Sequence, residues 1–354
     1  MAQASPMKKI LLISNRVMHY RSRIYNKFFD MFKELGYEFH VASNDFQKVD
    51  FPIRYIRHDA PFSTRNYTRL IAEIKPDVCI NFLHLKDKII IPLTFYCRWK
   101  KIPMIYWNHG INIKTPDAKL KNSIFHFIHT ISSAIILYSP AQLKYLSKRN
   151  QKKTFIAKNT LDFSDVDRKA LRSPEEVKAA YGIKEKHVIL YISRILPYKG
   201  LDILLEQFKD CTDTALVVVG GGISEQQQAI IDSNPHYYYL GEKYGKDVDE
   251  IYQIGDVFST PGHIGLALNQ AMFWGIPVVV LNRIHAPEII YLKNGENGFI
   301  VDSEAELKTK ICEICENREL HDRLSAAARH TYETEMQIEN MFQGFIDAIR
   351  FVGK

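Results

Sequence analysis

Short apolar runs alternate with stretches of helical periodicity along the first half of this 354-residue chain. Lys9–Ser14 predicts a buried strand, and Ile24, Phe28 and Phe32 then share one face of a helix that ends at Gly36. The same alternation predicts further strands at Tyr37–Ser43, Val78–Phe82, Pro103–Trp107, Ala134–Tyr138 and Lys153–Ala157. Strands that alternate with helices at this spacing predict a parallel sheet covered by helices on both faces.

The second half repeats this pattern after a charged stretch, Asp162–Lys178. Buried strands are expected in the run that begins at His187, at Asp256–Ser259 and at Val278–Leu281. Beyond Asp302 the periodicity is helical, at Leu307–Cys315, Arg318–Thr331 and Met336–Phe351. The chain therefore predicts an α/β fold of two doubly wound, Rossmann-like domains facing a cleft. The domain bounds are 7–165 and 166–335, followed by a helix in 336–354.

Two cations follow the strand that begins at His187. Arg194 and Lys199 lie in a short loop, and Gly200 precedes an amphipathic helix. Fixed cations at the carboxyl end of a parallel strand, next to a helix start, suit a diphosphate. The alternative is a pair of solvated surface cations, the usual state of Arg and Lys.

A glycine-rich loop follows the strand expected at Asp256–Ser259. Gly262 and Gly265 allow backbone to approach a ligand, and a helix is expected to open near Leu266. Such a turn alone is weak evidence. Together with the loop that carries Arg194 and Lys199, it indicates a nucleotide-diphosphate site.

With these elements in place, the chain resembles the large family of retaining glycosyltransferases with the GT-B fold. The motifs that carry the resemblance lie between residues 185 and 302: strand-Arg-x4-Lys-Gly, a Gly-rich loop with a helix ending in Ala-Met-x-x-Gly-x-Pro-Val, Pro287-Glu288, and Asn294-Gly295-x-x-Gly298. The resemblance implies that the second domain binds a nucleotide sugar and the first binds the acceptor. It also implies that the C-terminal helix crosses back and packs on the first domain.

The resemblance further implies roles for individual residues. Arg194 and Lys199 would hold the donor diphosphate and stabilise it as it leaves, and His109 would orient the sugar. The other implied donor-binding residues are Glu242 along the base and Gly262, His263, Ile264, Gly265 and Leu266 against the sugar and phosphates. Since the cations serve the diphosphate, neither a metal nor another cofactor is expected. The alternative for His109 is a partly buried side chain satisfied by a neighbour.

One departure from the family pattern concerns a pair of glutamates eight residues apart, which here align to Gly262 and Gln270. Gln270 can still hydrogen-bond a ribose hydroxyl but adds no negative charge. Gly262 has no side chain for the sugar, so His263 is the nearest replacement. Two Asp-x-Asp triplets follow no buried strand, so metal ligation is not favoured there: Asp165–Asp167 lies in the linker between the domains, and Asp247–Asp249 precedes a helix as a cap-like cluster.

The loop after the first strand lacks the paired glycines of many relatives. It offers Asn15, Arg16, His19 and Arg21, which suit an anionic or hydroxyl-rich acceptor. The alternative is a solvated basic loop.

Charge is distributed unevenly along the chain. Residues 1–165 contain 27 Lys and Arg against 12 Asp and Glu, whereas residues 166–354 contain 20 against 28. The first half is therefore expected to face something anionic, such as a membrane surface, a lipid-diphosphate acceptor or an acidic glycan. Nucleic acid is not expected because no binding module is recognisable. The alternative is a difference in surface charge with no partner behind it.

Aromatic and basic residues gather in Phe95–Lys101 and again in Ser123–Ile136, which suggests peripheral membrane contact. The second stretch is apolar on more than one helical face, which favours core instead. Five cysteines, an odd number, are typical of a reducing cytoplasm, so a cytoplasmic protein at the inner face of the membrane is expected.

The function expected from these features is a retaining, metal-independent glycosyltransferase. It would move a hexose or related sugar from a nucleotide-diphosphate donor, UDP favoured over GDP, to a glycan or lipid-linked acceptor in cell-surface polysaccharide synthesis. Two alternatives stay open. One is a catalytically degenerate subunit that binds a sugar nucleotide or glycan, which the residues at 262 and 270 motivate. The other is a nucleotide-sugar epimerase on the same fold.

Overall fold

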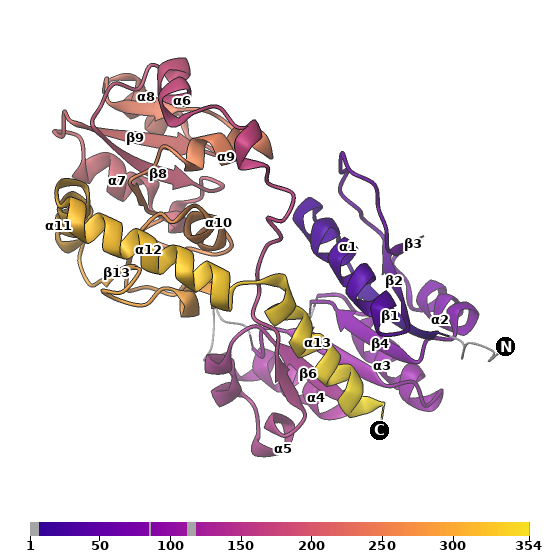
Figure 1. Cartoon of the computed structure of the whole chain (residues 1–354). Helices are drawn as coiled ribbons and strands as arrows, with labels where there is room; N and C mark the ends of the chain where they lie inside the picture. Colours follow the sequence, from indigo (N-terminus) through magenta and orange to yellow (C-terminus); the bar gives the residue numbers. More distant parts are fainter. Residues whose placement is uncertain (1–6, 85, 112–117, 354) are drawn as a thin grey trace. The chain divides into compact units, whose positions relative to one another are not determined.

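A computed structural model describes residues 7–84, 86–111 and 118–353, and divides the chain into two compact units (Figure 1). The first unit comprises residues 1–162 and 338–354, and the second comprises 163–337. Among the described residues, no helix combines the length and apolar character needed to cross a bilayer.

The first unit contains a seven-stranded parallel sheet in the order β3-β2-β1-β4-β5-β6-β7. Its strands are β1 (Lys8–Ser14), β2 (Tyr37–Ser43), β3 (Ile56–Asp59), β4 (Val78–Phe82), β5 (Met104–Asn108), β6 (Ala134–Leu137) and β7 (Thr154–Ile156). Its helices are α1 (His19–Glu34), α2 (Thr64–Ile74), α3 (Ile90–Trp99), α4 (Lys119–Ile131), α5 (Lys148–Gln151) and α13 (Ile338–Val352).

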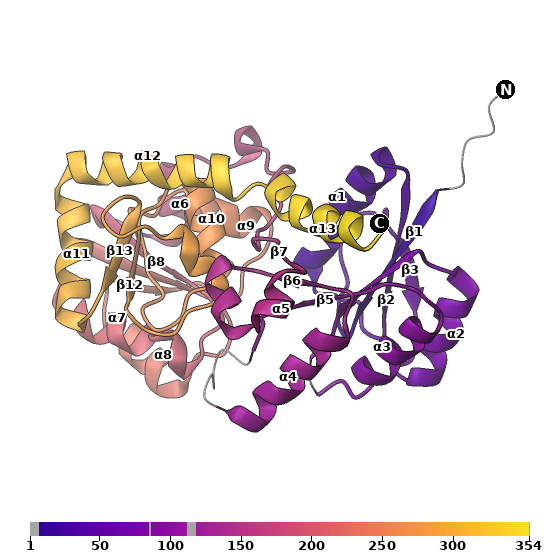
Figure 2. The ribbon, with the colours of Figure 1, turned by 90° about the horizontal axis from the view of Figure 1, so that it is seen from below.

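Two hydrophobic cores cover the faces of this sheet. Helices α2, α3 and α4 pack on one face, whereas α1 and α13 pack on the other (Figure 2). The C-terminal helix α13 places Phe345 4.8 Å from the ring of Trp107 and 5.0 Å from that of Phe28. Gly344 allows this close approach, since a Cβ there would lie 2.3 Å from the carbonyl oxygen of Ile156. The expected crossing back of the last helix is confirmed.

The second unit contains a six-stranded parallel sheet in the order β10-β9-β8-β11-β12-β13. Its strands are β8 (His187–Ile192), β9 (Thr214–Val219), β10 (Tyr237–Tyr239), β11 (Val257–Phe258), β12 (Val278–Leu281) and β13 (Gly298–Val301). Its helices are α6 (Pro174–Tyr181), α7 (Leu201–Gln207), α8 (Glu225–Asp232), α9 (Lys246–Tyr252), α10 (Ala267–Trp274), α11 (Glu304–Glu316) and α12 (Arg318–Glu335). Helices cover both faces of this sheet as well, so the α/β fold with two parallel, doubly wound sheets is confirmed.

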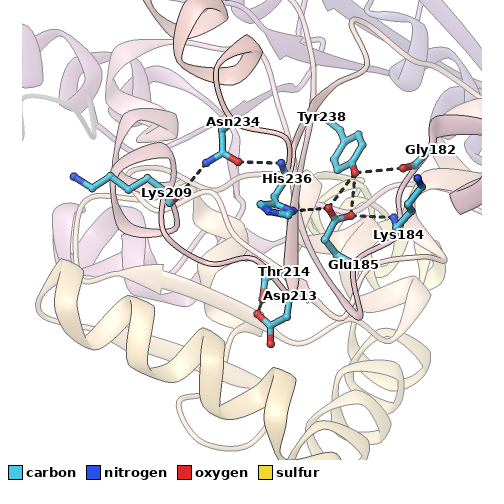
Figure 3. A network of polar contacts seen from close by, with 9 residues as sticks. All are labelled: Gly182, Lys184, Glu185, Lys209, Asp213, Thr214, Asn234, His236 and Tyr238. Atoms are coloured by element: carbon cyan, nitrogen blue, oxygen red, sulfur yellow. Dashed lines mark hydrogen bonds and ion pairs between the residues drawn. The ribbon is translucent and has the colours of Figure 1, made fainter.

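A network of hydrogen bonds lies at the edge of this sheet where β8 begins (Figure 3). The carboxylate of Glu185 accepts hydrogen bonds from His236 Nδ1 at 2.7 Å and from the Tyr238 hydroxyl at 3.0 Å. Burial opposes the charged form of Glu185, but these hydrogen bonds outweigh it and lower the pKa of the carboxyl group. This network at the amino-terminal edge of the sheet is structural, and the loops with candidate chemistry lie at the opposite edge.

Candidate functional site

Four loops form one continuous edge at the carboxyl ends of β10, β9, β8 and β11. Backbone hydrogen bonds join each loop to the next: Gly220 N–H to Gly241 O at 2.9 Å, Ile195 N–H to Gly221 O at 2.8 Å, and Gly262 N–H to Lys199 O at 3.0 Å. In an open parallel sheet this is the edge at which ligands bind. All the donor-binding residues predicted in the second unit lie on these loops or on α10, which follows them.

Arg194 and Lys199 are carried by the loop after β8. Arg194 is exposed and forms no ion pair with any residue that the structure describes, whereas Lys199 is partly buried. Lys199 ends a single 3₁₀ turn, Pro197–Lys199, and Gly200 reverses the chain with φ 82° before α7 begins. The backbone around both cations is fixed by hydrogen bonds to neighbouring loops, so its position is set without a ligand.

The backbone around Gly262 leaves no room for a side chain, which explains why no carboxylate stands at this position. A Cβ on this residue would lie 2.2 Å from the carbonyl oxygen of Tyr198, a distance that side chains do not tolerate. Gly200 is constrained in the same way, since its Cβ would meet Gly262 N at 2.9 Å. The two glycines let the loops after β8 and β11 touch through their backbones, which brings Lys199 next to the glycine-rich loop.

Two histidines hold the loop after β11. His263 Nδ1–H donates to Ile284 O at 2.8 Å, and its ring packs edge-on against Tyr198 at 5.5 Å. His285, which the sequence analysis did not single out, accepts from Ile264 N–H at Nδ1 and donates from Nε2 to Leu281 O. A ring that accepts at one nitrogen and donates at the other is neutral, and burial lowers the pKa of His285 accordingly.

The predicted donor-binding residues of this loop differ in what they can offer. Ile264 has a fully buried side chain, and its backbone N–H and carbonyl are bonded to His285 and Ala286. The Ile264 side chain therefore packs in the core of the second unit and supports the loop. Gly265 and Leu266 are only partly buried and precede α10.

Gln270 lies on α10 with its amide oriented by Asp249. The Gln270 Nε2 group donates to Asp249 Oδ1 at 2.8 Å, and Trp274 Nε1 donates to the same oxygen at 3.4 Å. Because a carboxylate only accepts, the amide oxygen of Gln270 is turned away from Asp249. Asp249 belongs to one of the two Asp-x-Asp triplets, and its carboxylate accepts a hydrogen bond from the Gln270 amide. In the other triplet, Asp167 caps a short 3₁₀ turn through Lys169 N–H.

Glu242 lies on the loop after β10, which is separated from the loop with Arg194 and Lys199 by the loop after β9. Its carboxylate rests over Gly221, where an added Cβ would lie 2.1 Å from Glu242 Oε1. Tyr244 donates its hydroxyl hydrogen to the other carboxylate oxygen at 3.2 Å. The exposed Glu242 thus marks the end of the loop edge that lies furthest from β11.

In the first unit, His109 follows β5 directly. Its ring lies 4.6 Å from that of Tyr138, and its Nδ1 atom is buried with no hydrogen-bond partner among the described residues. Burial, together with the nearby charges of His84 and Arg21, lowers the pKa of His109 to about 4. The imidazole is therefore neutral at physiological pH.

Arg21 is the predicted acceptor-binding residue that comes close to His109. It lies in the first turn of α1, is buried, and places its guanidinium 4.8 Å from the ring centre of Trp107. Its Nη2 lies 3.5 Å from the Tyr138 hydroxyl. A buried arginine over an indole ring is held by cation–π attraction, so Arg21 belongs to the wall around His109.

The other three predicted acceptor residues are each tied to a different neighbour. Asn15 donates to Asp87 Oδ2 at 3.0 Å, and Arg16 pairs with Asp45 at 2.8 Å. The backbone N–H of His19 donates to Gln47 Oε1 at 3.0 Å, and its ring Nδ1 lies 3.2 Å from the same oxygen. The structure thus places one of the four beside His109 and distributes the other three along the edge loops.

His129 makes the stability of the first unit dependent on pH. It is fully buried, faces Asn108 Oδ1 at 3.3 Å, and burial lowers its pKa to about 3. A histidine with a lowered pKa stabilises the fold fully above its unfolded pKa, and this contribution is lost as the pH falls. At pH 5 the loss is about 2 kcal/mol for this group.

We therefore expect the urea midpoint to fall between pH 7 and pH 5, and to fall less in His129→Gln. The glutamine keeps a polar group beside Asn108 but takes up no proton. Equal decreases in the two proteins would show that another group is responsible.

A family model covers much of the second unit. Residues 173–331 match the family described as glycosyl transferases group 1. The matched segment contains Arg194, Lys199, Glu242, the loop 262–266 and Gln270.

Two curated relatives match over part of their length. Spore coat protein SA of Bacillus subtilis is 24% identical over 185 residues, covering 46% of this chain and 48% of that protein. An uncharacterized 41.2 kDa protein in the cps region of Klebsiella pneumoniae is 26% identical over 236 residues, covering 63% of each. The chain thus spans between about half and just under two thirds of these relatives.

Solved structures match over nearly the whole chain. A glycosyltransferase from Rickettsia africae has a TM-score of 0.76 at 15% identity, covering 99% of this chain and all of that one. Anabaena HepE in complex with UDP and glucose has a TM-score of 0.73 at 16% identity, covering 97% and 99%. WaaG, a glycosyltransferase involved in lipopolysaccharide biosynthesis, has a TM-score of 0.69 at 14% identity, covering 98% and 100%.

At these identities the solved structures establish the fold. The resemblance expected from the sequence is confirmed: the chain has the GT-B fold, and its segment 173–331 matches the glycosyl transferases group 1 family.

Proposed function

We propose that this protein is a retaining glycosyltransferase that uses a nucleoside-diphosphate sugar, with UDP favoured as the nucleotide. The observation that carries the proposal is the loop edge of the second unit, where Arg194 and Lys199 are held beside the glycine-rich loop through Gly262. The complex of HepE with UDP and glucose supports this choice of donor. Lipopolysaccharide biosynthesis by WaaG and the cps region of the Klebsiella relative support a glycan or lipid-linked acceptor in cell-surface polysaccharide synthesis.

In the proposed reaction the bond between the anomeric carbon and the diphosphate oxygen breaks, and the diphosphate leaves with the bonding electron pair. An acceptor hydroxyl forms the new bond on the same face of the sugar, and its proton passes to the leaving phosphate or to water. Arg194 and Lys199 stabilise the charge that develops on the diphosphate, which is the part a metal ion plays in other folds. The neutral ring of His109 would orient the sugar as an uncharged hydrogen-bonding group.

Gln270 and Asp249 together would replace the missing second carboxylate of the family. The hydrogen bond from Nε2 to Asp249 turns the amide oxygen of Gln270 outward, where it can accept from a ribose hydroxyl. The ribose contact would therefore survive the change from Glu to Gln.

The proposed function is tested by two measurements on the same protein. Thermal stability is recorded across UDP, GDP, ADP and their sugar conjugates, since a selective ligand at 100 times its Kd stabilises by about 2.7 kcal/mol. Nucleotide release from the selected donor is then measured with and without glycan or lipid-linked acceptors. Release that accelerates with acceptor is expected. Binding without release in every combination would favour the alternative, a degenerate sugar-nucleotide-binding subunit, which the glycine at 262 motivates.

His263 is proposed to select the donor sugar. Because its Nδ1 hydrogen is directed to Ile284 O, the contact that its ring can offer a sugar hydroxyl is an acceptor at Nε2. We expect His263→Ala to lower kcat about two- to tenfold, the size of one hydrogen bond, while the Kd for the bare nucleoside diphosphate is unchanged. If nucleotide affinity falls with kcat, His263 supports the loop instead, and if neither changes it has no role in the donor site.

A further inference from the structure

Two helices of the first unit carry apolar side chains on their outer faces. On α3 these are Phe95 and Trp99, and on α4 they are Leu120, Ile124 and Phe127. Trp99 is 72% exposed and Leu120 is 81% exposed. Spacings of three and four residues put each set on one helical face. We call these five residues the outer patch.

The outer patch is continuous across the two helices. Helices α3 and α4 lie next to each other on one face of the sheet (Figure 2), and the rings of Phe95 and Phe127 are 6.3 Å apart. The inner faces of both helices are already used, since Leu93, Cys97 and Ile128 are buried against the sheet. From the sequence alone, the apolar character of α4 on several faces favours core. The structure corrects this, because one face is core and another is exposed.

The charged residues of the two helices themselves have one sign. Neither α3 nor α4 contains an Asp or Glu. Arg98, Lys100 and Lys101 are exposed at the end of α3, and none of them forms an ion pair with a described residue. Lys100 lies over the Trp99 ring at 4.1 Å. The cations therefore border the apolar surface directly.

A small polar pocket lies one helical turn beyond Phe95 and Phe127. It measures about 240 Å³ and is lined by Arg98, Lys101, Ser132 and Ser133, among others. Burial, and then the charges of Arg149 and Arg98, lower the pKa of the neighbouring Lys153 to about 8. Several cations thus lie near this pocket, and a cluster of charges of one sign favours an anion there.

We propose that the outer patch docks on an anionic lipid bilayer, with the apolar side chains at the headgroup boundary and the cations on lipid phosphates. Exposed apolar patches of this continuity mark interaction sites. Trp and Phe beside Lys and Arg, without acidic residues, match the chemistry of an anionic membrane surface. A protein partner is less well matched, because lysine is depleted at protein interfaces. This surface is separate from the donor loops, so the inference does not depend on the proposed reaction.

The test is co-sedimentation of the full chain with vesicles, without donor or acceptor present. Binding is expected to vesicles of equal parts phosphatidylcholine and phosphatidylglycerol, to be absent with phosphatidylcholine alone, and to weaken with salt. Trp99→Ala combined with Phe127→Ala should lower the partition coefficient at least about tenfold, since each large apolar side chain buried contributes about 1.5–3 kcal/mol. Arg98→Glu with Lys101→Glu should abolish binding to the anionic vesicles.

The matched control is Leu35→Ala. Leu35 is an exposed apolar residue of the same unit, at the end of α1 on the other face of the sheet, and its loss should leave vesicle binding unchanged. Circular dichroism confirms that each variant is folded. Unchanged partitioning of the Trp99/Phe127 variant, or equal binding to both kinds of vesicle, would overturn the proposal. A protein that is dimeric until the patch is mutated would also overturn it, since a second copy would then cover these side chains.

Discussion

Replacing Lys199 with alanine is expected to lower the turnover of sugar transfer about 10²–10³-fold, which corresponds to about 2.7–4 kcal/mol of transition-state stabilisation. The charge that Lys199 would meet develops on the diphosphate only as the glycosidic bond breaks. Its main chain is fixed independently of its side chain, because the carbonyl accepts from Gly262 N–H and the N–H donates to Leu196 O. The truncation should therefore remove the cation without moving the loop.

Two further variants make this result specific. Lys199→Arg keeps a positive charge on the loop and should recover part of the turnover, although it does not reproduce the point charge of an ammonium group. Lys209→Ala removes an exposed lysine of the same unit that pairs with Glu206, and should leave turnover unchanged. Wild-type turnover in Lys199→Ala, measured by nucleotide release with saturating acceptor, would remove Lys199 from the proposed mechanism.

Most strands in the middle of each sheet could be predicted from the sequence because they are buried on both faces, although β9 (Thr214–Val219), which is equally buried, was missed. β1, β4, β5, β6 and β12 are nearly continuous apolar runs, and each lies where the pattern predicted it. The edge strand β3 (Ile56–Asp59) was missed, because its residues are mostly exposed and show no apolar alternation. β11 is also shorter than expected, since only Val257 and Phe258 pair with neighbouring strands.

The candidate site could be predicted where its charged residues or glycines come directly after a strand in the sequence. Arg194, Lys199 and the glycine-rich loop met this condition. The residues that position them did not, because they come from elsewhere in the chain. His285 follows β12 and holds Ile264 across 21 residues, and Asp249 on α9 orients Gln270 across the same separation. No spacing of residues along the sequence indicates such pairs, because the two elements meet only in the folded protein.

Gly262 shows how packing can explain a residue that the family pattern leaves unexplained. The pattern alone predicts that Gly262→Glu restores the lost carboxylate and raises activity. The geometry predicts the opposite, because the new Cβ would lie 2.2 Å from Tyr198 O and 3.1 Å from the carbonyl carbon of Lys199. These are backbone atoms, so the strain cannot be relieved by rotating a side chain. The loop that carries Lys199 must move instead.

We therefore expect Gly262→Glu to reduce turnover and nucleotide affinity together, each by at least about tenfold, and to destabilise the second unit by about 1–3 kcal/mol, the usual cost of overpacking. Titration calorimetry with the nucleoside diphosphate and a thermal melt measure the affinity and the stability. Gly265→Ala is the matched control for stability in the same loop, since its Cβ would make an ordinary contact of 3.4 Å with Ala286 Cβ. If Gly262→Glu binds nucleotide normally and turns over faster, the loops can separate to admit a side chain. The backbone contact between Gly262 and Lys199 would then not be what holds the diphosphate site together.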